Sequence, residues 1–233
     1  MPRSQFLSSG LFVPLLAGAS LRDRLLASLG ALLGITFVGL TCTLIFPASL
    51  PWIVAPVGAS AVLLFAVPAS PLAQPWSIAG GNVVSAITGI LVMQFVHEPV
   101  VAAAVAVSSA ILMMSLLRCL HPPGGAAALS AVLGGHSLAS GHAPSFLALV
   151  LINSAFLVAI GWLFHRFSGH SYPHRARPVE GKALPPVPAS GLLIDDIDAA
   201  LDDLGETFDI SREDLALLLD RAEVHAASRL DRV

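Results

Sequence analysis

The first two thirds of the chain are almost free of charge. Between Leu25 and Leu117 the only Asp, Glu, Lys or Arg is Glu98. A soluble domain carries about a quarter of such residues, so a segment of this length without them cannot present a surface to water. The segment must be solvated by lipid, and the sequence therefore predicts a membrane protein.

The charges that the chain does have lie near its ends. Only 12% of the residues are charged and 55% are hydrophobic, and most charges precede Leu25 or follow Trp162. An interpretation of the N-terminus as a signal peptide is disfavoured, because Pro14 breaks its apolar run. We predict a cytoplasmic or interfacial lead-in over 1–24, a membrane domain over 25–167, a proline-rich linker over 168–191 and an acidic helical hairpin tail over 192–233.

Six apolar segments lie within the membrane domain. A helix needs about 20 apolar residues to span the hydrocarbon core. Four segments reach or approach this length, namely Leu25–Phe46, Ile78–Phe95, Val100–Leu117 and Ser145–Phe164. The other two, Ala55–Val67 and Pro122–Leu133, are shorter. Length alone leaves open whether these two cross the membrane or re-enter it from one side.

The two short segments begin alike. Pro56–Ala61 and Pro123–Ala128 share the pattern Pro-x-Gly-Ala-(Ser/Ala)-Ala at an offset of 67 residues, and the same offset places the third segment, Ile78–Phe95, on the sixth. We therefore predict an all-α, polytopic fold with two three-segment repeats, Leu25–Phe95 and about Val100–Phe164. If each repeat crosses the membrane three times, the two repeats are inverted relative to one another.

Basic residues predict the orientation, because Lys and Arg gather on the cytoplasmic side of a membrane. Arg22 and Arg24 precede the first segment, Arg118 follows the fourth, and Arg166 opens a basic run after the sixth. With six crossings, all of these fall on one side. We therefore expect both termini in the cytoplasm and the protein in the inner (plasma) membrane of the cell. With re-entrant short segments, Arg118 would lie outside.

The starts of the short segments are the candidate functional site. Proline suits the first turn of a helix, whose N–H groups have no partner in the helix, and glycine leaves those groups uncovered. A helix start attracts anions, and paired Gly/Pro-interrupted segments in inverted repeats mark a transporter's substrate site. Leucine at Gly58 or Gly124 should block such a site. Close packing of small residues is the alternative explanation.

The sequence also resembles a known family. The string Arg118-Cys119-Leu120-His121-Pro122-Pro123-Gly124-Gly125-Ala126 resembles the signature of the HPP family of integral membrane proteins, and so do residues 55–61, residues 70–75 and Gly81-Asn82. The resemblance covers about Leu11 to Phe167. The family's membrane domain is usually described with four or five spans. In this chain Trp76-Ser77 and Asn82 replace an Arg-Asn pair and a histidine present in many members.

The resemblance implies transport, since plant members are implicated in moving nitrite across a chloroplast membrane. We expect a channel or carrier for a small inorganic anion, nitrite-like by resemblance. The candidate substrate-binding residues are Pro56, Gly58, Ala59, Ser60, Asn82, His121, Pro123, Gly124, Gly125 and Ala126. Arg118 is favoured as a membrane anchor that snorkels to the surface, and Asn153 as an interhelical hydrogen-bonding residue.

Enzymatic and nucleic-acid functions are not expected. The chain has no paired intramembrane carboxylates, no H-E-x-x-H and no G-x-S-x-G, which are signatures of catalytic sites. Cys42 and Cys119 lack the spacing of metal ligands, so we expect no metal and no cofactor. No basic cluster large enough for a nucleic-acid backbone is present. The expected partners are the lipid bilayer and the anion.

The tail predicts two short helices. Leu192–Gly205 has apolar residues on one side and ends at a glycine, and Ser211 begins a capped helix that runs to about Leu230. Two such helices are too small to be stable alone. They would dock on the membrane domain, on a domain supplied elsewhere, or on another copy, which would make a homo-oligomer. In some family members a pair of CBS-type nucleotide-sensing domains follows the membrane domain, and a sensor or regulatory scaffold signalling through the tail is the alternative function.

Overall fold

The computed structural model describes residues 20–46, 53–135, 138–176, 193–205 and 207–230. Within these ranges every regular element is a helix. Most of the predicted lead-in over 1–24 and most of the predicted linker over 168–191 lie outside the described residues.

All six apolar segments form helices, as the sequence predicts. The elements in chain order are α1 (Leu21–Ile45), α2 (Pro56–Ala66), the short 3₁₀ helix η1 (Pro71–Ala73), α3 (Pro75–Phe95), α4 (Pro99–Leu116), α5 (Pro123–Leu133), the short π-helix η2 (Leu138–His142), α7 (Ala143–Ser168), α8 (Ile194–Leu204) and α9 (Arg212–Leu230). Among the described helices, α1, α3, α4 and α7 are long and apolar enough to cross a membrane, and α2 and α5 are shorter.

Capping side chains set the helix boundaries. Helix α1 begins earlier than predicted because the Asp23 carboxylate accepts a hydrogen bond from the Ser20 amide at 2.9 Å and the Ser20 hydroxyl accepts one from the Asp23 amide at 3.3 Å. Such a capping box pairs two amides that have no partner within the helix. The Glu98 carboxylate accepts a hydrogen bond from the Val101 amide at 2.7 Å and caps α4 in a similar way.

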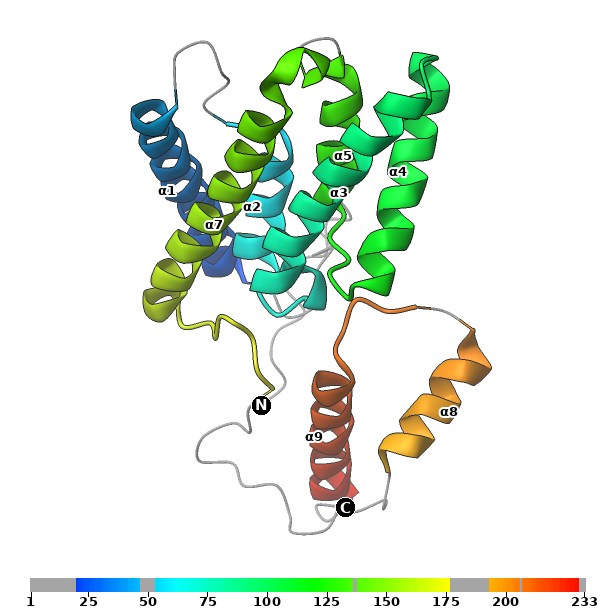
Figure 1. Ribbon diagram of the computed structural model, residues 1–233. Helices are drawn as coiled ribbons and strands as arrows, with labels where there is room; N and C mark the ends of the chain where they lie inside the picture. Colours follow the sequence, from blue (N-terminus) through cyan, green and yellow to red (C-terminus); the bar gives the residue numbers. More distant parts are fainter. Residues whose placement is uncertain (1–19, 47–52, 136–137, 177–192, 206, 231–233) are drawn as a thin grey trace, which may run out of the picture.

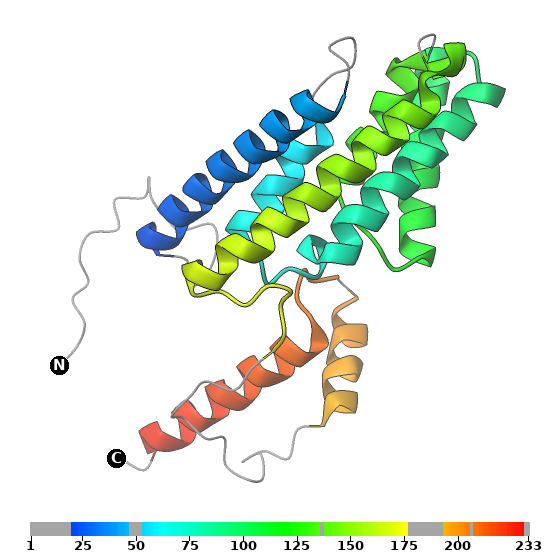
Figure 2. The ribbon, with the colours of Figure 1, turned by 60° about the vertical axis from the view of Figure 1, so that its left-hand side comes forward.

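The six apolar helices form one bundle (Figures 1 and 2). Helix α3 packs against α4, α5 and α7, whereas α1 packs against α2 and α7, and the two short helices contact each other. Successive helices run in opposite directions (Figure 1). Helices α8 and α9 lie off one end of the bundle (Figure 2), which we call the tail end. Helix α1 begins there, α4 and α7 end there, and η1 lies there.

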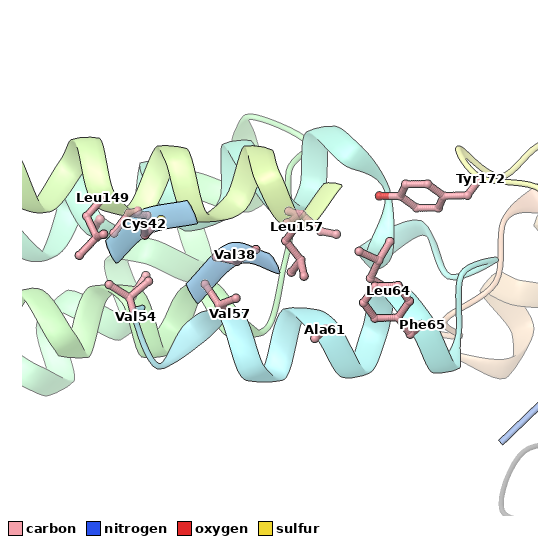
Figure 3. Close-up of a cluster of buried hydrophobic side chains, with 14 residues drawn as sticks. Val38, Cys42, Val54, Val57, Ala61, Leu64, Phe65, Leu149, Leu157 and Tyr172 are labelled. Carbon is pink, nitrogen blue, oxygen red and sulfur yellow. The ribbon is translucent and has the colours of Figure 1, made fainter. Parts of the chain in front are cut away.

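The largest core cluster joins α1, α2 and α7 (Figure 3). Val38 of α1, Leu64 of α2 and Leu157 of α7 are fully buried in it. A second contact depends on small residues, because Ala102, Ala106 and Ala110 form a stripe along α4 that packs against Ala128 of α5. Small side chains let helix backbones approach closely inside a membrane, where burial of apolar surface drives no association.

The outer surface of the bundle is apolar. Large hydrophobic side chains such as Leu40, Leu44, Phe95 and Phe167 are between 64% and 87% exposed. A soluble monomer rarely exposes contiguous apolar surface of more than a few hundred Å². These outward-facing residues together with the four long apolar helices make the chain a membrane protein.

The tail forms the two predicted helices. Gly205 ends α8 with a left-handed φ of 65°, a conformation that glycine adopts without steric strain. The Ser211 hydroxyl accepts a hydrogen bond from the Asp214 amide at 3.1 Å and begins α9. The Arg212 guanidinium lies 3.0 Å from the Asp198 carboxylate and links the two helices.

Candidate functional site

Four polar side chains from different elements meet inside the bundle. Ser60 comes from α2, Asn82 from α3, His121 from the segment before α5, and Ser154 from α7. Each is at most 1% exposed. We call these four residues the polar chain, because hydrogen bonds join them in series. Uncompensated polar groups are costly at such depth, so their pairing decides what the site is able to bind.

The polar chain has a direction. The His121 ring lies 2.8 Å from the Leu72 carbonyl through Nδ1, and since a carbonyl only accepts, Nδ1 carries the hydrogen. In a neutral imidazole Nε2 is then an acceptor, so the Ser60 hydroxyl donates to it over 2.7 Å. The Asn82 amide in turn donates from Nδ2 to Ser60 Oγ at 3.3 Å and to Ser154 Oγ at 3.1 Å.

Two polar atoms on the same face of α3 have no hydrogen-bond partner among the residues that the structure describes. Asn82 Oδ1 and Ser85 Oγ are buried and make no hydrogen bond, and they come from residues three apart, which neighbour each other on a helix. Ser85 lies against the first turn of α5, since a Cβ on Gly124 would be 2.6 Å from its hydroxyl oxygen. A buried unpaired group costs about 1–3 kcal/mol, so its presence calls for an explanation such as a functional role.

Glycine at position 81 lets His121 reach the polar chain. A Cβ on Gly81 would lie 2.6 Å from the Cβ of His121 and 2.7 Å from the Cys119 carbonyl oxygen. Real Cβ atoms do not approach a backbone oxygen so closely, so any other residue would push this segment away from α3. Asn82 therefore supplies one member of the polar chain, and Gly81 leaves the space that another member, His121, occupies.

The structure brings together some of the predicted site residues. Ser60, Asn82 and His121 form three of the four members of the polar chain, and Gly124 lies beside Ser85. Pro56 and Pro123 are buried in the first turns of α2 and α5. Ser154, Ser85 and the Leu72 carbonyl were not predicted. Ser85 could have been found by its spacing of three from Asn82, whereas no pattern in the sequence marks Ser154.

The remaining predicted residues lie away from the polar chain. Gly58 and Ala59 are exposed, and a Cβ on Gly58 would meet nothing within 4 Å. A Cβ on Gly125 would instead lie 3.8 Å from Val107 of α4, and Ala126 is only partly buried. The expectation that leucine at Gly58 would block the site therefore does not fit the geometry.

The prediction of uncovered backbone donors at the helix starts is wrong. The amides of Val57 and Gly58 donate to carbonyls three residues back at 3.0 and 3.2 Å, and those of Gly124 and Gly125 do so at 2.8 and 3.0 Å. These bonds form because the residues before each helix, Ala55 and Pro122, already have helical backbone angles. The groups able to contact a solute here are therefore side chains.

Asn153 has the interhelical role that the sequence predicts, and the exposure of Arg118 agrees with the predicted membrane anchor. Asn153 Oδ1 accepts a hydrogen bond from the Val54 amide at 3.1 Å, and its Nδ2 lies 3.1 Å from Cys42 Sγ. Asn153 therefore ties α7 to α1 and to the segment before α2. Arg118 is exposed at the tail end, as a membrane anchor would be, and has a φ of 53°.

The tail docks on the turn that also holds His121. The Ser70 hydroxyl, which precedes η1, donates to Asp209 Oδ1 at 2.8 Å. Two residues later, the Leu72 carbonyl is the partner of His121. His174 Nε2, beyond α7, lies 2.9 Å from Asp214 Oδ1 of α9. The turn η1 therefore stands between the tail and the polar chain.

Comparison with known proteins identifies the family. A family model described as the HPP transmembrane region matches residues 17–173, which include α1 to α7 and the whole polar chain. Neither the curated proteins nor the solved structures that were compared gave a match. The match covers more than half of the chain and ends before α8. The chain therefore belongs to the HPP family of membrane proteins.

Proposed function

We propose that this protein transports a small inorganic anion across a membrane. The observation that carries the proposal is the polar chain, buried in a lipid-facing bundle with unpaired atoms on Asn82 and Ser85. Polar groups inside a membrane are rare and mark substrate paths. The family resemblance points to nitrite as the substrate. Neutral amide, hydroxyl and imidazole groups suit a monovalent anion, whereas a buried divalent anion would require paired cations.

We also propose that all six apolar helices cross the membrane as two inverted repeats, with the tail end in the cytoplasm. The alternating helix directions support this topology (Figure 1). In the described bundle the arginines, such as Arg22, Arg118 and Arg166, belong to the tail end, which agrees with the preference of basic residues for the cytoplasm. For this reason we place the protein in the inner (plasma) membrane with both termini cytoplasmic.

A basic recess at the tail end supports an anionic substrate. It has a volume of about 430 Å³, and Arg166, Arg175 and His170 are among the residues that line it. Clefts lined by one sign of charge raise the local concentration of the opposite ion. A recess of this kind would gather anions on the cytoplasmic side before they reach the bundle.

Flux through liposomes containing the purified protein tests the transport proposal. We expect nitrite to enter faster than into protein-free liposomes. Ser60→Ala should reduce the rate at least several-fold, because it removes the link between Asn82 and His121. Ser108→Ala is the matched control, since the Ser108 hydroxyl is exposed on α4 and bonds only to the Val105 carbonyl at 3.1 Å. The absence of flux for nitrite, nitrate, formate and chloride alike would refute the proposal.

The docked tail favours a second candidate function, a sensor or regulatory scaffold. Its support is the hydrogen bond from Ser70 to Asp209, which ties the tail to η1. A tail that serves only as a sensor would change its docking without changing flux. A tail that regulates transport would change both.

Acid should release the tail. Partial burial opposes the charge of Asp214, but hydrogen bonds from Ser211 and His174 outweigh it, and the pKa of this carboxyl lies below its ordinary value of 3.8. Because docking lowers this pKa, the charged carboxylate stabilises the docked tail fully at pH values above 3.8. The stabilisation is lost as the pH falls through the lowered pKa. Hydrogen exchange of α9 amides, corrected for intrinsic rates, should therefore accelerate in acid.

A substitution provides the same test at neutral pH. Asp214→Asn should accelerate exchange in α9, whereas Asp203→Asn, at an exposed position of α8, should not. Equal protection of α9 in Asp214→Asn and in the wild type would contradict a docking role for this carboxylate.

A further inference from the structure

We propose that one proton accompanies each anion, with His121 as the proton-binding group, and that reversal of the polar chain links the two. This inference rests on the proposed transport function and specifies its coupling ion. It starts from the direction of the hydrogen bonds described above. With Nδ1 of His121 bonded to the Leu72 carbonyl, the only ring atom left to accept a proton is Nε2, which faces Ser60.

A proton on Nε2 reverses the bond between His121 and Ser60. The imidazolium donates from both nitrogens, so Ser60 Oγ now accepts from His121 and its own hydrogen needs another acceptor. The unpaired acceptor beside it is Asn82 Oδ1. In the proposed reversal Asn82 rotates its amide by half a turn, so that Oδ1 accepts from Ser60 and Ser154 and Nδ2 takes the place of the unpaired oxygen.

The reversal changes what the site binds. Before protonation the unpaired atom is Asn82 Oδ1, an acceptor whose lone pairs repel an anion. After protonation it is an amide N–H₂ donor, and a positive charge lies on His121. Both changes favour an anion, which would accept from Asn82 and neutralise the imidazolium. Because a buried charge is stable only when it is paired, the proton and the anion favour each other's binding.

Among the described residues, the four helices nearest His121 supply no carboxylate as a counter-charge. Helices α2, α3, α4 and α5 contain no Asp, Glu, Lys or Arg. The titratable groups on neighbouring segments are Arg118 and Cys119, which precede His121, and His165 and Arg166 near the end of α7. Beyond α7, the Tyr172 hydroxyl bonds to the Ala73 carbonyl, and the His174 amide bonds to Gln74. Next to η1, Asp209 contacts Ser70. The partner of a protonated His121 is therefore the transported anion.

The charges balance over a cycle. A proton from one side binds His121 Nε2, the anion binds Asn82 Nδ2, and the pair carries no net charge. Release of the anion on the other side leaves the imidazolium unpaired, so the proton leaves next and the chain returns to its first direction. Transport is then electroneutral, with one proton for each anion.

Proton entry and nitrite uptake are both measured in liposomes that contain the full chain. A trapped pH-sensitive dye reports proton entry, and a potassium gradient with valinomycin sets the membrane potential. With nitrite outside, we expect one proton to enter for each nitrite above the rate of protein-free liposomes, independently of the membrane potential. His121→Gln should remove the proton entry and reduce acid-driven nitrite uptake at least tenfold. His97→Gln, in an exposed loop at the opposite end of the bundle, should behave as wild type.

Three outcomes separate the proposals. Nitrite uptake driven by the membrane potential without proton entry would overturn this inference and leave anion transport standing. Flux of no anion at all would overturn both. An unchanged ratio of protons to nitrite in His121→Gln would also overturn the role of His121.

A binding measurement adds a test that does not depend on flux. Calorimetric titration of nitrite in two buffers of different ionisation enthalpy should show one proton taken up per nitrite by the wild type and none by the variant. Should His121→Gln fail to elute as a folded protein, His121→Asn replaces it, because its amide retains a donor for the Leu72 carbonyl. Nitrite binding without proton uptake by the wild type would refute the inference.

Discussion

Asn82→Leu should yield a folded protein in which the proposed nitrite flux is at least tenfold slower than in the wild type. Leucine has the same number of side-chain heavy atoms with the same branching, and it removes both the donor to Ser60 and the unpaired oxygen. Removal of the unpaired Asn82 oxygen offsets the loss of the two hydrogen bonds that Nδ2 donates. We therefore expect the free energy of unfolding to change by less than about 1 kcal/mol. Loss of function without loss of stability distinguishes a transport residue from a structural one.

Asn153→Leu is the matched comparison, one residue before Ser154 on α7. Its Oδ1 is the partner of the buried Val54 amide, so leucine leaves that amide unpaired at a cost of about 1–3 kcal/mol. Thermal unfolding in detergent, followed by circular dichroism, should therefore show a lower midpoint for Asn153→Leu than for Asn82→Leu. If Asn82→Leu is the less stable variant, or transports nitrite at the wild-type rate, its proposed role is wrong.

Gly89→Ala should destabilise the bundle, because α3 and α5 leave no space for a methyl group at this position. A Cβ at this position of α3 would lie 2.5 Å from the Ala128 carbonyl oxygen and 2.8 Å from the Ala131 Cβ of α5. The oxygen belongs to helix backbone, so α3 and α5 would have to separate. Overpacking of this kind costs about 1–3 kcal/mol, and the polar chain would be pulled apart, because His121 leads directly into α5.

Gly58→Ala provides the control within another apolar helix. Nothing lies within 4 Å of its added methyl group, and alanine favours a helix over glycine by about 0.5–1 kcal/mol. This variant should be as stable as the wild type or more so. Unfolding in detergent at increasing denaturant measures both variants, and equal stability of Gly89→Ala and the wild type would show that α3 and α5 do not pack as described.

The elements could be predicted from sequence because their signals are local. The long uncharged segments are found as α1, α3, α4 and α7, and prolines mark the beginnings of α2 to α5 within a few residues. Helix α1 begins at Leu21, whereas the apolar segment predicted from sequence begins at Leu25. The capping residues Ser20 and Asp23 extend the helix through the charged residues that precede Leu25. In the tail, Gly205 and Ser211 mark helix ends in the same local way.

The site was less accessible to sequence analysis. Ser60, Asn82 and His121 were singled out as candidates beside two repeated helix starts. The hydrogen bond from Asn82 to Ser154 joins residues that are 72 positions apart, and no spacing rule reaches so far. Under the 67-residue offset Gly58 corresponds to Gly125, and neither glycine lies against the polar chain. Gly124, one residue earlier, lies against Ser85, which the repeat pattern does not indicate.

Charge and helix-capping chemistry act along the chain, so the sequence alone shows that this chain is a membrane protein built from apolar helices. The face of each helix that turns inward depends on contacts between helices, and it became known only from the fold. Helices that are apolar on every side carry no amphipathic pattern to reveal that face. Close contacts of glycine and alanine select it instead, and they bring Asn82, Ser60 and His121 into one hydrogen-bonded series.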